Sequence, residues 1–187
     1  MRTLREEVKK EGLEWIKAVG VGLIIFVFIR TFFFSNYEVE GESMMPTLED
    51  GNKLIVNKVG YQIGDFKRFD VIVFHANKEE DYVKRIIGLP GDKIEYKDDQ
   101  LFINDVKMEE PYLEKYRNQT LTRRLTEDFT LNEITGIETV PEGKLFVLGD
   151  NRLESWDSRR FGYISVDQVV GKVNLRYWPL DHMDISF

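Results

Sequence analysis

Ser43 lies in a short segment that could present a nucleophilic hydroxyl to a substrate. Residues 41–47 read Gly-Glu-Ser-Met-Met-Pro-Thr, so a flexible glycine precedes the serine and Pro46 stiffens the chain after it. Such a turn can offer both the hydroxyl and the backbone N–H of Ser43, and that amide can help to bind a developing oxyanion. Glycine, serine and proline also populate ordinary surface turns, so the heptapeptide by itself indicates only a turn.

A serine hydroxyl is unreactive at neutral pH without a general base. The candidates are the two histidines of the chain, His75 and His182, a carboxylate, or a lysine. Lys84 is the lysine of interest because it lies in an apolar, strand-like run at residues 82–87. Desolvation disfavours the charged form of a lysine, which lowers the pKa of the amine and allows it to accept the serine proton. Many strand lysines are instead solvated edge residues.

Strand alternation places the Lys84 side chain on one face of that run. Tyr82 and Ile86 share this face, whereas Arg85 points to the opposite face. Alternation does not indicate which of the two faces is buried, so the desolvation of Lys84 is an expectation.

A third segment, residues 149–162, concentrates small polar and charged side chains directly after a β-type run. It reads Gly-Asp-Asn-Arg-Leu-Glu-Ser-Trp-Asp-Ser-Arg-Arg-Phe-Gly. Such a cluster can orient a catalytic lysine by a hydrogen bond and hold a site rigid with Asp–Arg pairs. It could also form a polar surface loop that contains structural ion pairs.

The elements that would position these residues are mostly short strands, because β-branched and aromatic runs alternate with turn residues. Two of the runs flank Lys97-Asp98-Asp99 and predict a hairpin. The polar segment 109–138 predicts a surface excursion or small cap, within a variable insert at about 98–140. The strands are expected at residues 53–59, 70–74, 82–87, 93–96, 100–103, 144–148 and 169–177.

The N-terminal region predicts a membrane anchor. Residues 13–34 span 22 mostly apolar positions, enough to cross roughly 30 Å of hydrocarbon as a helix. Lys and Arg are concentrated before this stretch, which favours a cytoplasmic N-terminus, and no small-x-small cleavage site follows the apolar core. We therefore expect a single-pass protein of the plasma membrane. Its parts are a cytoplasmic N-terminus at 1–12, a transmembrane anchor at 13–34 and an extracytoplasmic catalytic domain at 35–187.

Composition excludes several classes of function. The chain has 187 residues and a formal net charge of −7, which argues against broad nucleic-acid binding. It has no cysteine and only two histidines, so disulfides, thiol nucleophiles and cysteine- or histidine-rich metal sites are excluded. We expect no cofactor and no metal.

Together the segments resemble a known family. In order along the chain, Gly-Glu-Ser-Met-Met-Pro-Thr, Phe-Asp-Val-Ile-Val-Phe, Tyr-Val-Lys-Arg-Ile-Ile-Gly-Leu-Pro-Gly-Asp and the segment at 149–162 are similar to the four motifs of type I signal peptidases of the short, single-anchor bacterial kind. The similarity runs from the anchor to about Gly171. It implies a mainly β fold, a largely antiparallel β-domain of the signal-peptidase/LexA-like kind, preceded by one N-terminal transmembrane helix. It also implies cleavage of secretory preproteins after an Ala-x-Ala-like sequence at the membrane surface, in contact with lipid.

The resemblance also implies a role for individual residues. Ser43 matches the nucleophile, Lys84 the general base and Ser155 the hydroxyl that orients the lysine. The remaining matches are structural bracing by Arg85, Asp150, Asp157 and Arg159, and a substrate groove lined by Val39, Met44, Leu48, Tyr82 and Val83.

One position departs from the family pattern. Some members carry a serine two residues before the nucleophile, where its hydroxyl contributes to the oxyanion hole, but here the position is Gly41. The hole would then use the backbone amide of Ser43 with a second donor such as the Gly41 amide or water.

Two other functions remain open from the sequence. A Ser-Lys autoprotease like the LexA-type repressors has a related β-fold, but the anchor and the lack of a DNA-binding helix pair disfavour it. A catalytically silent, membrane-tethered binding module could keep the same fold, but the presence of both Ser43 and Lys84 disfavours that function.

Overall fold

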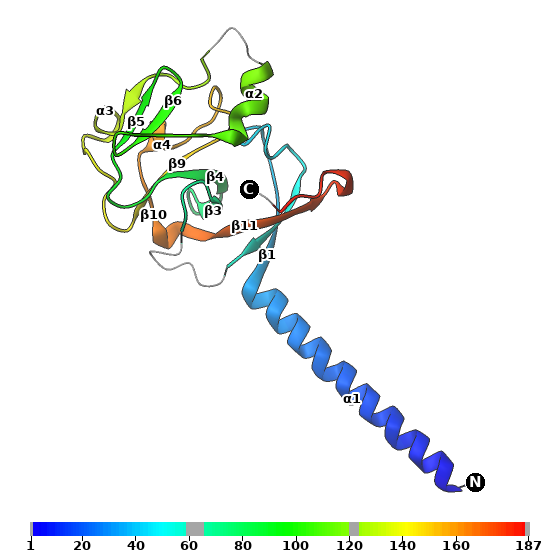
Figure 1. The fold of residues 1–187 in the computed structure, drawn as a ribbon. Coiled ribbons are helices and arrows are strands. Elements are labelled where there is room, and N and C mark those ends of the chain that lie inside the picture. Colours follow the sequence, from blue (N-terminus) through cyan, green and yellow to red (C-terminus); the bar gives the residue numbers. More distant parts are fainter. Residues whose placement is uncertain (1, 59–65, 120–123, 186–187) are drawn as a thin grey trace.

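The computed structural model describes residues 2–58, 66–119 and 124–185 and consists of a β-rich body from which one helix projects (Figure 1). A helix was expected over residues 13–34, and this helix, α1 (Arg2–Phe33), covers all of that range except Phe34, which already belongs to a strand. Among the residues described, no helix is long and apolar enough to cross a membrane. The expectation of a membrane-spanning helix at 13–34 is therefore not supported by the structure.

The larger of two sheets is antiparallel and carries Lys84, whereas Ser43 lies in the loop between two of its strands. Its strand order is β1-β2-β11-β3-β4-β9-β10. Although three strands separate β1 from β4 in this order, the Tyr37 hydroxyl of β1 donates to Asp81 of β4 at 2.8 Å. The sheet must therefore curl so that these two strands face each other. The strands are β1 (Phe34–Glu38), β2 (Lys53–Asn57), β3 (Val71–His75), β4 (Asp81–Gly88), β9 (Lys144–Leu148), β10 (Ile164–Ser165) and β11 (Val169–Trp178).

A second, four-stranded antiparallel sheet occupies the region expected to hold an insert. The predicted hairpin is confirmed as β5 and β6, and two further short strands extend it in the order β7-β6-β5-β8. The segment 109–138, expected as a surface excursion or small cap, contributes a strand and helices. These elements are β5 (Ile94–Lys97), β6 (Gln100–Ile103), β7 (Val106–Met108), β8 (Phe129–Thr130), η1 (Pro111–Leu113), α2 (Glu114–Gln119) and α3 (Leu131–Thr135).

The other strand predictions are confirmed with shifts of one or two residues at their ends. Val59, the last residue of the strand expected at 53–59, lies outside the described residues. β3 and β4 pair antiparallel, which places Ile72 opposite Lys84. Three further short helices follow in the described part of the chain: α4 (Ser158–Phe161), η2 (Val166–Gln168) and η3 (Leu180–His182).

Three hydrophobic clusters fix the position of the candidate site. One joins the two sheets through side chains such as Ile87 and Phe146 of the larger sheet and Tyr96 of the smaller one. A second lies under the serine turn, where Met44 and Leu48 are fully buried. Burial of such side chains stabilises the fold by about 1.5–3 kcal/mol each, so the turn that carries Ser43 is held against the sheet. The third cluster fills the region around β3, β9 and β10.

Candidate active site

Ser43 and Lys84 lie in direct contact although 41 residues separate them. The Lys84 Nζ is 2.7 Å from the Ser43 Oγ and 3.0 Å from the Val83 carbonyl oxygen. Ser43 sits in a turn closed by backbone hydrogen bonds, among them Met45 N–H to the Glu42 carbonyl at 3.1 Å. The distance predicted for a serine and its general base, about 2.6–3.2 Å, is met.

The Lys84 amine is removed from solvent. Lys84 is only 3% exposed, and this burial lowers the pKa of its amine to about 8. The negative charges of Asp157 and Asp150 act in the opposite direction, raising the pKa of the amine, but burial is the larger effect. A substantial fraction of Lys84 is therefore neutral near pH 8 and able to accept a proton.

Two Arg–Asp pairs flank the lysine. Arg85 donates to both carboxylate oxygens of Asp150, at 2.9 and 2.6 Å, and both side chains are buried. Arg159 binds Asp157 in the same two-pronged manner, at 2.9 and 2.8 Å. Asp157 is fully buried, whereas Arg159 is partly exposed, so the second pair lies at the edge of the domain. Two-pronged pairs fix both the position and the orientation of a carboxylate.

Ser155 does not make the hydrogen bond that the family resemblance implies. Its Oγ is buried and has no hydrogen-bond partner among the described residues, so it makes no hydrogen bond with Lys84. The hydroxyl lies against Gly149, where an added Cβ would come within 2.2 Å of the Ser155 Oγ and 2.3 Å of the Ser43 carbonyl oxygen. Only glycine fits at position 149, because a side chain would displace the serine turn.

The Gly41 amide, expected as one possible second oxyanion donor, already donates to another group. The acceptor is Asp50 Oδ1 at 2.7 Å, and the Gly41 φ of 87° belongs to the left-handed region that glycine tolerates. The amide is therefore engaged in closing the turn rather than facing a substrate. The Ser43 amide, in contrast, donates no hydrogen bond within the described part of the chain, so it remains free to bind an oxyanion.

A groove of about 830 Å³ opens beside the Ser43–Lys84 pair. Four of the five side chains expected to line it do so: Val39, Met44, Tyr82 and Val83. The fifth, Leu48, is fully buried in the cluster beneath the serine turn and does not line the groove. Because the walls come from the end of β1 and the start of β4, an extended peptide can lie between these strands.

Comparison with known proteins identifies the family. The family model described as "Signal peptidase, peptidase S26" matches residues 12–178. The chain belongs to the type I signal peptidases. It is 56% identical over 184 residues to signal peptidase I of Bacillus caldolyticus, covering 98% of this chain and 100% of that protein. It is 45% identical over 184 residues to signal peptidase IB of Staphylococcus aureus (strain MRSA252), covering 96% of each.

A solved structure supports the same family. The chain is similar to a signal peptidase I from Enterococcus faecalis V583, with a TM-score of 0.55 and 44% identity, over 59% of this chain and 98% of that one. As a signal peptidase I, the chain is a serine endopeptidase, a hydrolase that removes signal peptides from preproteins.

The structure also adds residues that sequence reasoning missed. Asn151 holds the serine turn, because its amide N–H donates to the Ser43 carbonyl oxygen and its side chain to the Glu42 carbonyl oxygen, both at 3.1 Å. Its place in the segment at 149–162 is the signal that could have indicated it. Trp156, 60% exposed, lines the groove from the same segment.

His75 belongs to a separate cluster on the groove wall. Its Nδ1 lies 2.6 Å from one carboxylate oxygen of Asp81, and the Tyr37 hydroxyl donates to the other. Burial, with help from Asp81, raises the pKa of Tyr37 to about 12, so its hydroxyl stays protonated. No hydrogen bond links His75 to Ser43 among the described residues, and His182 lies in η3, where it is paired weakly with Asp181.

Proposed function

We propose that this signal peptidase cleaves preproteins with a Ser43–Lys84 dyad, in which Ser43 is the nucleophile and Lys84 the general base. The observation that carries the proposal is the 2.7 Å contact between Ser43 Oγ and a lysine amine that is almost completely buried. A solvated lysine would be protonated at neutral pH and could not accept the serine proton. The test is preprotein processing by chains that carry Ser43→Ala or Lys84→Ala, both of which should lose turnover.

The reaction proceeds in two halves. Neutral Lys84 accepts the Ser43 proton as Oγ attacks the scissile carbonyl carbon, and the Ser43 amide donates to the resulting oxyanion. The tetrahedral intermediate then expels the amine of the mature protein, which takes the proton from Lys84. In the second half, Lys84 removes a proton from water, the hydroxide attacks the acyl-enzyme ester, and Ser43 Oγ recovers the proton as the signal peptide leaves with a new carboxylate.

The charged residues around the dyad help to set the pKa of Lys84. Burial alone lowers the pKa of the amine, while Asp157 and Asp150 raise it, so the two effects oppose each other. Arg85 and Arg159 fix these carboxylates in place. In our proposal these four residues brace the site and do not contact the substrate.

We further propose that substrates are cut after an Ala-x-Ala-like sequence. Val39, Met44 and Val83 contribute apolar side chains to the groove lining beside Ser43, and Met44, 1% exposed, is tightly packed there. Overfilling a packed apolar site typically costs about 1–3 kcal/mol. Replacing the alanine before the scissile bond by leucine is therefore expected to lower kcat/KM by roughly 5- to 150-fold.

This specificity is measured with purified protein in detergent, from initial rates and mass-spectrometric mapping of the cut. Leucine at the middle position of the motif is the matched control and should change kcat/KM by less than about twofold. Equal processing of the alanine and leucine substrates would disprove the proposed pocket.

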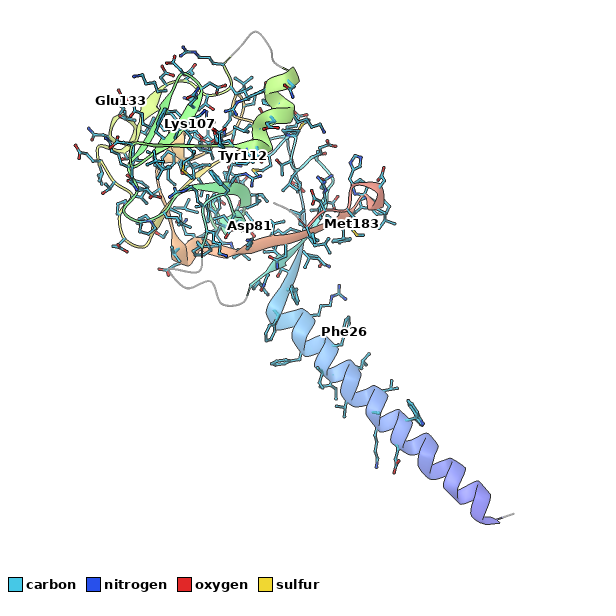
Figure 2. All side chains as sticks on the ribbon, in the orientation of Figure 1. Phe26, Asp81, Lys107, Tyr112, Glu133 and Met183 are labelled. Atoms are coloured by element: carbon cyan, nitrogen blue, oxygen red, sulfur yellow. The ribbon has the colours of Figure 1, made fainter. Side chains whose placement is uncertain are left out.

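We also propose that α1 tethers the enzyme to the plasma membrane, with residues 1–12 cytoplasmic and 35–187 on the outer side. Large apolar side chains of α1 are exposed and lie away from the β-rich body, as Phe26 does in Figure 2. Examples are Leu23, Ile24 and Phe26, exposed by 63%, 70% and 60%. An unpartnered apolar surface of this size favours contact with lipid.

Charges in this surface are expected to abolish tethering. An aspartate near the centre of a membrane-inserted helix costs about 2.5–3.5 kcal/mol, so Leu23→Asp with Phe26→Asp should lower partition into phospholipid vesicles by at least ~10³-fold. The measurement is flotation of the full chain with vesicles. Val106→Asp, at a side chain of β7 that is also exposed (62%), is the control and should float like the wild type. Flotation of the double variant at the wild-type level would exclude α1 as the tether.

A further inference from the structure

Arg152 is a buried cation that the dyad mechanism does not use. Its side chain has no exposed surface, yet it lies only three residues after Gly149, at the start of the loop 149–157 that surrounds the dyad. A buried charge is tolerated only where hydrogen bonds and an opposite charge compensate its lost hydration. The partners of Arg152 therefore indicate what the residue holds in place.

The compensating charge comes from the part of the chain that holds the smaller sheet and its short helices, residues 94–119 and 124–135, called here the smaller sheet region. Glu110, which precedes η1, accepts at a single oxygen, Oε1, from Arg152 at 2.6 Å, from the Tyr96 hydroxyl at 2.7 Å and from the Tyr112 hydroxyl at 2.7 Å. Burial acts to raise the pKa of Glu110, but the Arg152 charge and these hydrogen bonds keep it below its ordinary value. Arg152 also donates to the Tyr96 hydroxyl at 2.6 Å and to Thr126 Oγ1 at 3.2 Å.

The other end of the Arg152 side chain contacts the dyad loop itself. Its Nε donates to the Gly149 carbonyl oxygen at 3.0 Å. Gly149 lies against both Ser155 and the Ser43 carbonyl oxygen, and its own amide donates to Asp157 at 3.1 Å. A shift of Gly149 would therefore move the serine turn and one of the two carboxylates that act on Lys84.

A second connection runs through Tyr112. The Arg85 guanidinium lies 4.0 Å from the centre of the Tyr112 ring, and Arg85 is the partner of Asp150 (Figure 2 labels Tyr112). The Tyr112 ring thus covers the Arg85–Asp150 pair, while its hydroxyl binds Glu110. The two buried ion pairs are joined by one side chain from the smaller sheet region.

We propose that Arg152 and Glu110 are positioning residues for the signal peptidase reaction, and that the smaller sheet region serves to hold the loop 149–157 against the Ser43–Lys84 dyad. The inference rests on the proposed dyad. It assigns a catalytic purpose to Glu110 and Arg152, neither of which lines the groove.

The effect is expected in kcat and not in KM. Arg152→Lys keeps a positive charge beside Glu110 but removes the guanidinium donor to Gly149, and Glu110→Gln keeps the shape but removes the charge. A displacement of about 1 Å at a reacting group can cost on the order of 100-fold in rate. We expect kcat to fall by about 10- to 100-fold in each variant, with KM within about twofold of the wild type, in a preprotein assay well below the unfolding temperature.

Arg68→Lys is the matched control for a purely structural role. Arg68 also forms a two-pronged pair, with Asp92 at 2.7 and 3.1 Å, and binds the Ile87 carbonyl oxygen at 2.6 Å, but it does not contact the loop 149–157. We expect a lower unfolding temperature for Arg68→Lys with kcat within about twofold of the wild type. Tyr112→Phe, which loses only a hydroxyl, gives a variant that keeps the fold, and its kcat should fall by roughly two- to tenfold.

Two results would overturn the inference. One is an unchanged kcat in Glu110→Gln and Tyr112→Phe; the other is a loss of kcat in Arg68→Lys as large as in Arg152→Lys. Either result would leave the dyad intact if Ser43→Ala abolishes turnover in the same assay, whereas activity in Ser43→Ala would instead remove the basis of the proposed function.

Discussion

Ser43→Ala is expected to lower kcat on a preprotein by roughly 10⁴- to 10⁶-fold, because no other hydroxyl can form the acyl-enzyme at this position. The Lys84 amine contacts Ser43 Oγ at 2.7 Å, and removal of that oxygen leaves the base without a nucleophile. Folding should be little affected, since the turn is held by Met44, Leu48 and backbone contacts rather than by the hydroxyl. The measurement is initial-rate processing of a purified preprotein by protein in detergent.

The chain contains a well-matched control for this variant. Lys144 Nζ lies 2.6 Å from Ser165 Oγ, a serine–lysine contact close in length to the 2.7 Å of the proposed dyad, but neither residue lines the groove. Ser165→Ala should therefore process the preprotein at the wild-type rate. Substantial turnover by Ser43→Ala, or a comparable loss in Ser165→Ala, would contradict the assignment of the nucleophile.

That comparison also bears on why the contact between Ser43 and Lys84 could be anticipated from the sequence. A serine–lysine contact is not distinctive by itself, as Lys144 and Ser165 demonstrate. What distinguishes Lys84 is its position in a run of apolar residues, which led us to expect desolvation. Alternation left open which face of the run is buried, and the structure buries the face that carries Lys84. The longer strands could also be predicted from the sequence. A run of five or more alternating apolar or β-branched residues is long enough to indicate a strand.

The smaller sheet was harder to predict because its elements are short. β7 has three residues and β8 has two, too few to display a period of two. Only the β5–β6 hairpin, with its Asp98-Asp99 turn, carries a recognisable pattern. The buried Arg152–Glu110 pair could not be predicted from the sequence either. Its two residues are 42 positions apart, and arginine and glutamate usually lie on the surface.

Local polar contacts account for two differences between the expected and the observed hydrogen bonds at the site. The Gly41 amide is taken by Asp50, nine residues away in the same turn region, and the sequence contains no signal that assigns an amide to one acceptor over another. The Ser155 hydroxyl is buried near the site but lacks the bond expected from family resemblance. The hydrogen bonds of Lys84 go to Ser43 and the Val83 carbonyl oxygen. Residue type fixes which bonds are possible, whereas side-chain rotamers fix which are made.

Lys84→Ala is expected to lower kcat/KM by about 10³- to 10⁴-fold, the range of a general base. Burial lowers the pKa of Lys84 to about 8, so the reactive neutral amine becomes rarer as the pH falls. Wild-type kcat/KM should therefore drop roughly tenfold for each pH unit below about 8 and level off above it. The measurement is kcat/KM of wild type and variant from pH 6 to pH 10 on one preprotein.

The variant should lose both the rate and its dependence on pH. The residual activity of Lys84→Ala should be nearly flat around pH 8, because the group that titrates there is absent. Lys144→Ala is the control and should keep the wild-type profile, since Lys144 contacts Ser165 outside the groove. His75→Ala should also retain the wild-type profile, because His75 binds Asp81 and not Ser43. If His75→Ala abolished turnover while Lys84→Ala left it intact, the base would be the histidine, and the buried amine would have only a structural role.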